Sequence, residues 1–135
     1  ILTAGDAFTR AISSSLSMEI PQAEQYKITY GLEESQLEGK ISKVLRPVFE
    51  VIVSEIKKAI LFWNENEKEP IKNVILYGGT AGLPQAATLL ASLLEIEVQI
   101  ADPFKSMEMD DKLRSSLLDK SCLLTVAIGL SEKEV

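Results

Sequence analysis

A glycine-rich segment, Gly78-Gly79-Thr80-Ala81-Gly82-Leu83-Pro84, carries the strongest chemical signal in the sequence. Two adjacent glycines let the backbone come close to a ligand, because no Cβ stands in the way. The N–H groups that open the following helix favour a phosphate or a sugar hydroxyl. The segment matches neither the dinucleotide fingerprint nor the phosphate loop that ends in Gly-Lys-Ser/Thr. Since many strand-to-helix turns contain glycines for geometry alone, composition by itself favours a structural role over ligand binding.

Three further groups could carry chemistry. Glu24 and Lys27 are three residues apart, so on a helix they share a face and could hold a polar ligand together. The alternative for them is a surface ion pair worth at most about 0.5 kcal/mol, which the pattern alone favours. Asp110-Asp111 could serve acid/base chemistry or a divalent cation, although paired carboxylates at a helix start more often complement the helix dipole. Cys122 lies in an apolar run typical of a packed, inert thiol.

Composition narrows the classes of function. The chain has 135 residues, 14 basic and 20 acidic, with a formal net charge of −6, so no broadly basic face is predicted and no nucleic-acid partner is expected. Histidine is absent, which excludes imidazole ligands and His-containing catalytic dyads. A single cysteine allows no intrachain disulfide. The apolar stretches are too short to span a bilayer and no signal peptide is evident, which predicts a soluble chain without membrane insertion.

The N-terminal half is expected to be helical. Asp6 is expected to cap a first helix that ends in the Ser-rich stretch 13–17. A second helix is predicted over 21–30, with Gly31 ending it in the left-handed conformation.

A third helical stretch begins at Ser35 and Glu38, which match a capping box, and its apolar stripe runs to Trp63. Pro47 interrupts this stripe, so either one kinked helix or two helices meeting there are expected. Residues 64–72 are predicted to form an exposed connection.

The C-terminal half indicates an α/β fold. Residues 74–77 are consecutive apolar β-formers, typical of a parallel strand covered on both faces. A helix over about 83–94 and a strand over 96–101 complete one βαβ unit. A polar helix around 111–118 and a buried C-terminal helix over 121–130 are expected to follow.

Five segments occur in an order that resembles the actin-fold ATPases. They are Ala4–Thr9, Ala23–Lys27, Gly78–Pro84, Val98–Phe104 and Val126–Leu130. The likeness is greatest to the PilM family of type IV pilus assembly proteins, which is related to the cell-division protein FtsA. The resemblance implies an α/β fold that is helix-rich with a short parallel βαβ unit, as in the C-terminal lobe of an actin-like (ribonuclease H-like) ATPase. Residues 1–135 would form this single lobe, which is the half of the ATPase domain that faces the adenosine.

The resemblance also implies an ATP site. Glu24 and Lys27 match the family's Glu and Lys that contact the adenosine side of ATP. Gly78, Gly79 and Thr80 match the loop beside ribose and α-phosphate, Gly82 and Leu83 border the base, and Gly5 matches the second glycine of a Gly-Gly-Asp segment beside the phosphates. Ala4 replaces the first glycine of that segment.

No catalytic or metal-binding residue is expected in this chain, because the family's two phosphate-binding hairpins, which organise magnesium, would precede Ile1. The chain alone should therefore not hydrolyse ATP, and the whole protein would be at most a slow ATPase.

The function implied is that of a cytoplasmic component of the type IV pilus inner-membrane assembly complex, held at the inner face of the membrane through its partners. Those partners would be ATP with magnesium, the N-terminal half of the same protein, and a PilN-like membrane protein peptide bound mainly by that half. Two alternatives are an actin-fold interaction scaffold without nucleotide binding, which Ala4 favours, and an unrelated small α/β enzyme that uses Asp110 or Asp111.

Overall fold

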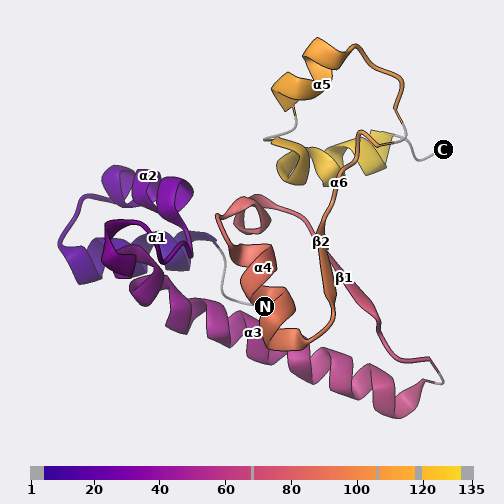
Figure 1. Ribbon diagram of the computed structural model, residues 1–135, viewed down its shortest axis with the longest axis horizontal. Coiled ribbons are helices and arrows are strands. Elements are labelled where there is room, and N and C mark those ends of the chain that lie inside the picture. Colours follow the sequence, from indigo (N-terminus) through magenta and orange to yellow (C-terminus); the bar gives the residue numbers. More distant parts are fainter. Residues whose placement is uncertain (1–4, 68, 106, 118–119, 132–135) are drawn as a thin grey trace.

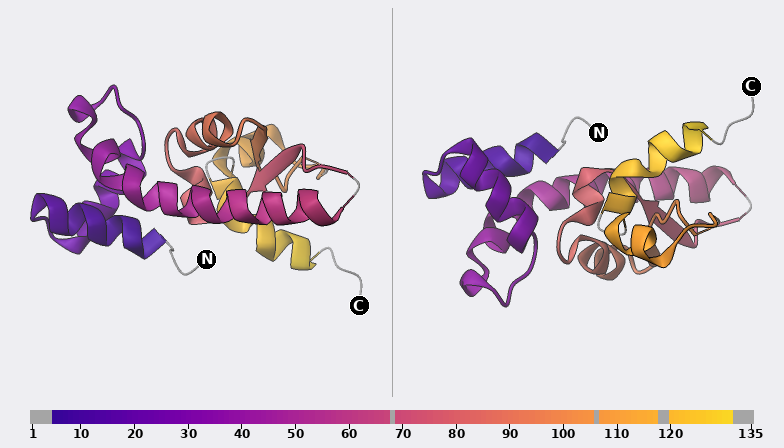
Figure 2. Two further views of the ribbon diagram at one scale, coloured as in Figure 1. Left: turned by 90° about the horizontal axis from the view of Figure 1, so that it is seen from below. Right: turned by 90° about the horizontal axis from the view of Figure 1, so that it is seen from above.

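The computed structural model describes residues 5–67, 69–105, 107–117 and 120–131. The elements follow in the order α1 (Gly5–Leu16), α2 (Ile20–Tyr30), the 3-10 turn η1 (Leu37–Gly39), α3 (Lys40–Asn66), β1 (Asn73–Leu76), the 3-10 turn η2 (Gly79–Gly82), α4 (Ala86–Leu94), β2 (Glu97–Ile100), α5 (Asp111–Leu117) and α6 (Ser121–Ser131). The long helix α3 runs along the molecule, with α1 and α2 packed at its N-terminal end (Figure 1). In the two views of Figure 2, the C-terminal end of α6 points away from α1 and α2.

The first two helices form as their apolar spacing predicts. Phe8 and Ile12, four residues apart on α1, are fully buried. The first helix ends within the Ser-rich stretch, as predicted, but Asp6 lies inside its first turn rather than capping it, because the helix already begins at Gly5. Gly31 ends α2 with φ 48° and ψ −127°, a positive-φ conformation outside the left-handed helical region that the sequence predicts.

Helix α3 begins differently from the prediction. The capping box does not form: the Ser35 N–H donates to the Glu33 carboxylate at 3.0 Å, and Glu38 lies inside η1 with φ 55°. The chain instead turns through positive φ, so that Ser42 Oγ, on the first turn of α3, donates to the Leu32 carbonyl at 3.1 Å. That contact joins the start of α3 to the end of α2.

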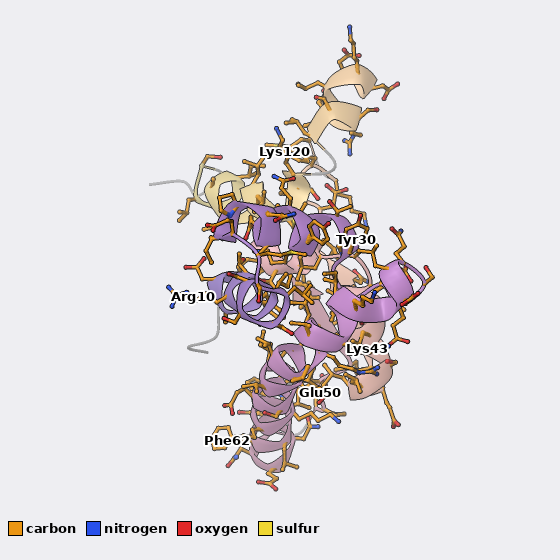
Figure 3. All side chains as sticks on the ribbon, turned by 90° about the vertical axis from the view of Figure 1, so that its left-hand side faces the viewer. Arg10, Tyr30, Lys43, Glu50, Phe62 and Lys120 are labelled. Atoms are coloured by element: carbon orange, nitrogen blue, oxygen red, sulfur yellow. The ribbon has the colours of Figure 1, made fainter. Side chains whose placement is uncertain are left out.

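A single helix passes through Pro47. Leu45 and Phe49, on either side of the proline, are buried in the same core, which holds the helix together where one backbone hydrogen bond is lost. The helix extends to Asn66, so the exposed connection expected over 64–72 is shorter than predicted. Phe62, 70% exposed, points away from the ribbon near the end of the helix (Figure 3).

The strands pair in parallel, which confirms the βαβ order. Val74 lies opposite Val98 and Leu76 opposite Ile100. Val74, Leu76 and Val98 pack against the core formed by α3 and α4. The expectation that β1 is covered on both faces is wrong for the described residues, because Ile75 is 58% and Tyr77 61% exposed. Alternate side chains of a strand point to opposite faces, and only one face of this sheet meets helices.

The last helix is also more exposed than predicted. Only Ser121 and Cys122, in the first turn of α6, are buried, while Leu123, Val126 and Leu130 are all more than half exposed. The cause is that, among the described residues, the main contact of α6 with the rest of the chain is with η2, near the beginning of the helix. The polar helix expected around 111–118 is α5, which buries none of its residues; position 118 lies outside the described residues.

Among the described helices, none combines the length and apolar character needed to cross a bilayer. Within the same ranges, no cluster of three or more acidic, Cys or His side chains could hold a metal ion.

Candidate functional site

Four segments distant in the sequence surround one pocket of about 370 Å³. They are the start of α1, the middle of α2, the η2 loop and the first turn of α6. The lining residues are Gly5, Glu24, Lys27, Ile28, Gly79, Thr80, Gly82, Leu83, Cys122 and Leu123. Seven of the eight site residues named from the sequence are therefore brought together here, and Gly78 is the one that does not line the pocket.

Lys27 forms the centre of a buried polar network. Its side chain is 10% exposed, and its Nζ donates to Glu24 Oε2 at 2.7 Å, to Thr9 Oγ1 at 3.0 Å and to the Gly5 carbonyl at 3.3 Å. An ammonium group has three protons, so these three acceptors use all of them. The network ties α1 to α2, and the ion pair is not the solvated surface pair that the spacing alone favours.

Glu24 supplies the negative charge at the pocket. The hydrogen bond from Lys27 lowers the pKa of its carboxyl group, and a second hydrogen bond from Thr9 lowers it further. Its side chain is 41% exposed, whereas the side chain of Lys27, which also lines the pocket, is 10% exposed. An ionised carboxylate only accepts hydrogen bonds, which suits a ligand that presents hydroxyl or amino groups.

The glycine-rich segment is a 3-10 turn rather than the direct start of a helix. Gly78, with φ 91°, donates its N–H to the Cys122 carbonyl at 2.8 Å, which fastens the loop to α6. The N–H groups of Ala81 and Leu83 donate within the turn, and α4 begins only at Ala86. The sequence predicts that a helix, with free N–H groups at its start, follows the glycines directly. That prediction is wrong, because a 3-10 turn comes first and uses the N–H groups of Ala81 and Leu83 in its own hydrogen bonds.

The glycines leave space that a side chain would fill. A Cβ on Gly5 would lie 3.7 Å from Lys27 Nζ and 3.8 Å from Thr80 Oγ1. A Cβ on Gly79 would reach Leu123 at 3.5 Å, and one on Gly82 would lie only 3.1 Å from Cys122 Sγ. The pocket thus depends on bare backbone at three of its walls.

Several site residues were not singled out for this role by sequence reasoning. Thr9 is 4% exposed and is hydrogen-bonded to both Lys27 and Glu24. It lies four residues after Gly5, on the same face of α1, and this spacing could have indicated that Thr9 belongs to the site. Ile28, Cys122 and Leu123 add apolar wall. No local pattern places α6 beside η2, so Cys122 and Leu123 could not have been found. The carboxylates Asp110 and Asp111 are exposed at the start of α5 and do not line the pocket.

The fold defines a class: this is the C-terminal part of an actin-like fold, helix-rich with a short parallel sheet. It superposes on a chain of the solved "PilM-PilN type IV pilus biogenesis complex" with a TM-score of 0.78 and 26% sequence identity. The match covers 96% of this chain and 36% of that chain, so the described sequence spans about a third of the length of the solved relative. The family model described as "Type IV pilus assembly protein PilM" matches residues 2–134, and the chain belongs to this family.

Proposed function

We propose that this chain forms the adenosine side of an ATP site in a PilM-like component of the type IV pilus machinery. The observation that supports the proposal most is the convergence of Gly5, Glu24, Lys27, Gly79, Thr80, Gly82 and Leu83 on one pocket. A volume of about 370 Å³ lies within the range of small-molecule sites, roughly 300–1,000 Å³.

The chemistry of the lining fits a nucleoside. Glu24 and Lys27 supply charged groups to the lining, whereas Ile28, Leu83 and Leu123 supply apolar surface. An adenosine has the same division, with a flat base on one side and a sugar bearing hydroxyls on the other. The carboxylate of Glu24 would accept hydrogen bonds from the sugar, and the apolar residues would cover the base.

Each residue of the network then has a distinct role. Lys27 has its protons engaged by its own chain, so it holds Glu24 ionised and in place rather than donating to the ligand. Gly79 and Gly82 would let the loop backbone approach the sugar and the base without a Cβ between them. Thr80 Oγ1 lies next to Gly5, 3.8 Å from where a Cβ on Gly5 would stand, and is beside the position proposed for the α-phosphate.

The remainder of the ATP site is assigned to the preceding part of the protein. That part would carry the two phosphate-binding hairpins and hold magnesium, whose charge supports phosphoryl chemistry when it is bound. A nucleotide that contacts both parts would favour the closed arrangement over the open one. We propose that this change is communicated to a PilN-like partner at the cytoplasmic face of the inner membrane.

The test is nucleotide binding by the full-length protein, measured by calorimetry. Gly79→Arg should weaken ATP binding, because its side chain fills the pocket at the position where Leu123 is 3.5 Å away. Asp111→Ala is the control, since Asp111 is exposed on α5 away from the pocket, and it should leave ATP binding unchanged. Equal affinities for the wild type and a folded Gly79→Arg variant would overturn the assignment of this pocket.

A second candidate is an actin-fold scaffold that does not bind nucleotide. The observation that favours it is the self-sufficiency of the Lys27 network, which satisfies the lysine without any ligand. Ala4, on which the sequence argument for a scaffold rests, lies outside the described residues. Absence of ATP binding by the wild-type full-length protein would support the scaffold.

A further inference from the structure

We propose that Thr9 is a positioning residue for Glu24, and that its hydroxyl lets the pocket select a ligand with free sugar hydroxyls. The inference rests on the proposed function of the pocket. Thr9 is 4% exposed and does not itself line the pocket, so it would act through Glu24 rather than on the ligand.

The hydrogen bonds of Thr9 fix one oxygen of the carboxylate. A hydroxyl has one proton to donate, and the nearest acceptors of Thr9 Oγ1 are Glu24 Oε2, at the shorter distance, and the Gly5 carbonyl at 3.3 Å. Thr9 Oγ1 also accepts from Lys27 Nζ at 3.0 Å. Glu24 Oε2 thus receives hydrogen bonds from both Thr9 and Lys27.

The second oxygen remains for a ligand. Among the residues that the structure describes, Glu24 Oε1 has no hydrogen-bond partner. With Oε2 held by Thr9 and Lys27, Oε1 is the oxygen of Glu24 left to accept a hydrogen bond from a ligand in the pocket that Glu24 lines. A ribose presents hydroxyl donors to such an acceptor, and a sugar that lacks a hydroxyl leaves it unpaired.

Thr9 also prevents an alternative position of Glu24. Glu24 lies between the pocket and a neighbouring hollow that is lined by Asp6, Thr9, Arg10, Ile20 and Pro21. Arg10 lines this hollow, and its guanidinium group is a positive charge that would attract a released carboxylate. Without the Thr9 hydroxyl, only Lys27 would hold Glu24 on the side of the pocket. Loss of the hydroxyl should therefore release Glu24 toward the hollow.

The experiment measures binding of ATP, 2′-deoxy-ATP and 3′-deoxy-ATP to the full-length protein by calorimetry. The wild type should bind ATP roughly tenfold more tightly than at least one of the deoxy analogues, because one hydrogen bond to a charged group is lost. Thr9→Val, which keeps the shape but loses the hydroxyl, should bring that ratio close to one. Thr9→Ser should retain the ratio, and so should Thr29→Val, which alters an exposed threonine on α2 outside the pocket.

The ratio separates a positioning role from a purely structural one. If Thr9→Val weakens ATP and both analogues by the same factor, Thr9 only supports the fold and the inference is wrong. If Thr9→Val does not fold, as judged by its melting curve, Thr9→Ala removes the same hydroxyl without burying a methyl group in its place and decides the question. A wild type that binds no nucleotide overturns the proposed function itself, whereas a wild type that binds ATP without preference overturns only this inference.

Discussion

Gly31 and Pro84 lie so close together that a Cβ on Gly31 would be 2.6 Å from Pro84 Cδ and 2.8 Å from the Pro84 backbone nitrogen. The next residue, Leu32, donates its N–H to the Pro84 carbonyl at 2.9 Å. This contact joins the end of α2 to the end of the η2 loop. Because α2 carries Glu24 and Lys27, the contact of Gly31 with Pro84 sets how the two main walls of the pocket face each other.

Replacement of Gly31 should therefore destabilise the protein. Gly31→Ala adds a clash with Pro84 to a positive φ of 48°, and together these should cost about 2–4 kcal/mol of unfolding free energy. Gly129→Ala is the control, because nothing lies within 4 Å of its Cβ position on α6, and it should be neutral or slightly stabilising. Urea unfolding of both variants gives the comparison, and equal midpoints for them would contradict the role of the contact.

The burial of the Lys27 network leads to a second prediction. Two lysines make an ion pair of the same spacing and length: Lys27 with Glu24 and Lys58 with Glu55, each at 2.7 Å. Lys27 is 10% exposed, whereas Lys58 is 71% exposed. Lys27→Met should lower the free energy of unfolding by about 1–3 kcal/mol, because it leaves buried acceptors unpaired. Lys58→Met should change it little, and a larger loss from Lys58→Met would show that burial does not control the effect.

The lowered pKa of Glu24 predicts a pH dependence of stability. Since the hydrogen bond from Lys27 lowers this pKa in the folded state, the ionised carboxylate stabilises the fold above its ordinary pKa of 4.5. That stability is lost as the pH falls through the lower, folded-state pKa. The stability difference between the wild type and Glu24→Gln should be largest near neutral pH and should shrink below about pH 4.5.

Thermal melts from pH 7 to pH 3 test this dependence. Glu55→Gln is the matched control, because hydrogen bonding to Lys58 also lowers the pKa of Glu55 but solvent surrounds that pair. The control should show a smaller effect. A difference between the wild type and Glu24→Gln that grows as the pH falls would have the wrong sign for this explanation.

The packing of η2 on α6 predicts coupling between Gly82 and Cys122. A Cβ on Gly82 would lie 3.1 Å from Cys122 Sγ, which is closer than ordinary contact. The change in unfolding free energy caused by Gly82→Ala should be more favourable in a Cys122→Ala background than in the wild type, by about 0.5–1 kcal/mol. A double-mutant cycle of unfolding free energies measures this term, and purely additive effects would mean that the two residues do not press on each other.

The open face of the sheet predicts self-association of this 135-residue chain. Ile75 on β1 and Tyr77 just after it are each more than half exposed, and an exposed apolar patch beside a strand edge favours association with another chain. Sedimentation at increasing concentration should show association, and Ile75→Lys should reduce it. Ile20→Lys, at an exposed position on α2, is the control. A monodisperse chain that Ile75→Lys leaves unchanged would contradict association through this face.

The sequence by itself determined the local geometry of the site. The helical spacing of Glu24 and Lys27 places both on one face of α2. Gly79 and Gly82 have no Cβ, so their backbone stays accessible to a ligand whatever the position of the loop in the fold. The spacing of Phe8 and Ile12 likewise determined which face of α1 is buried. These features involve residues a few positions apart, whose relative placement the helix or turn itself fixes.

Tertiary structure alone decided how these parts meet. The Lys27 network became buried because α1 packs on α2, and the pocket gained its apolar wall because Gly78 is hydrogen-bonded to Cys122, 44 residues later in the sequence. The failed capping box at Ser35 and the exposed face of α6 have the same origin. A local pattern shows which side chains can be buried or can bind, but distant segments that come together in the fold decide whether they are.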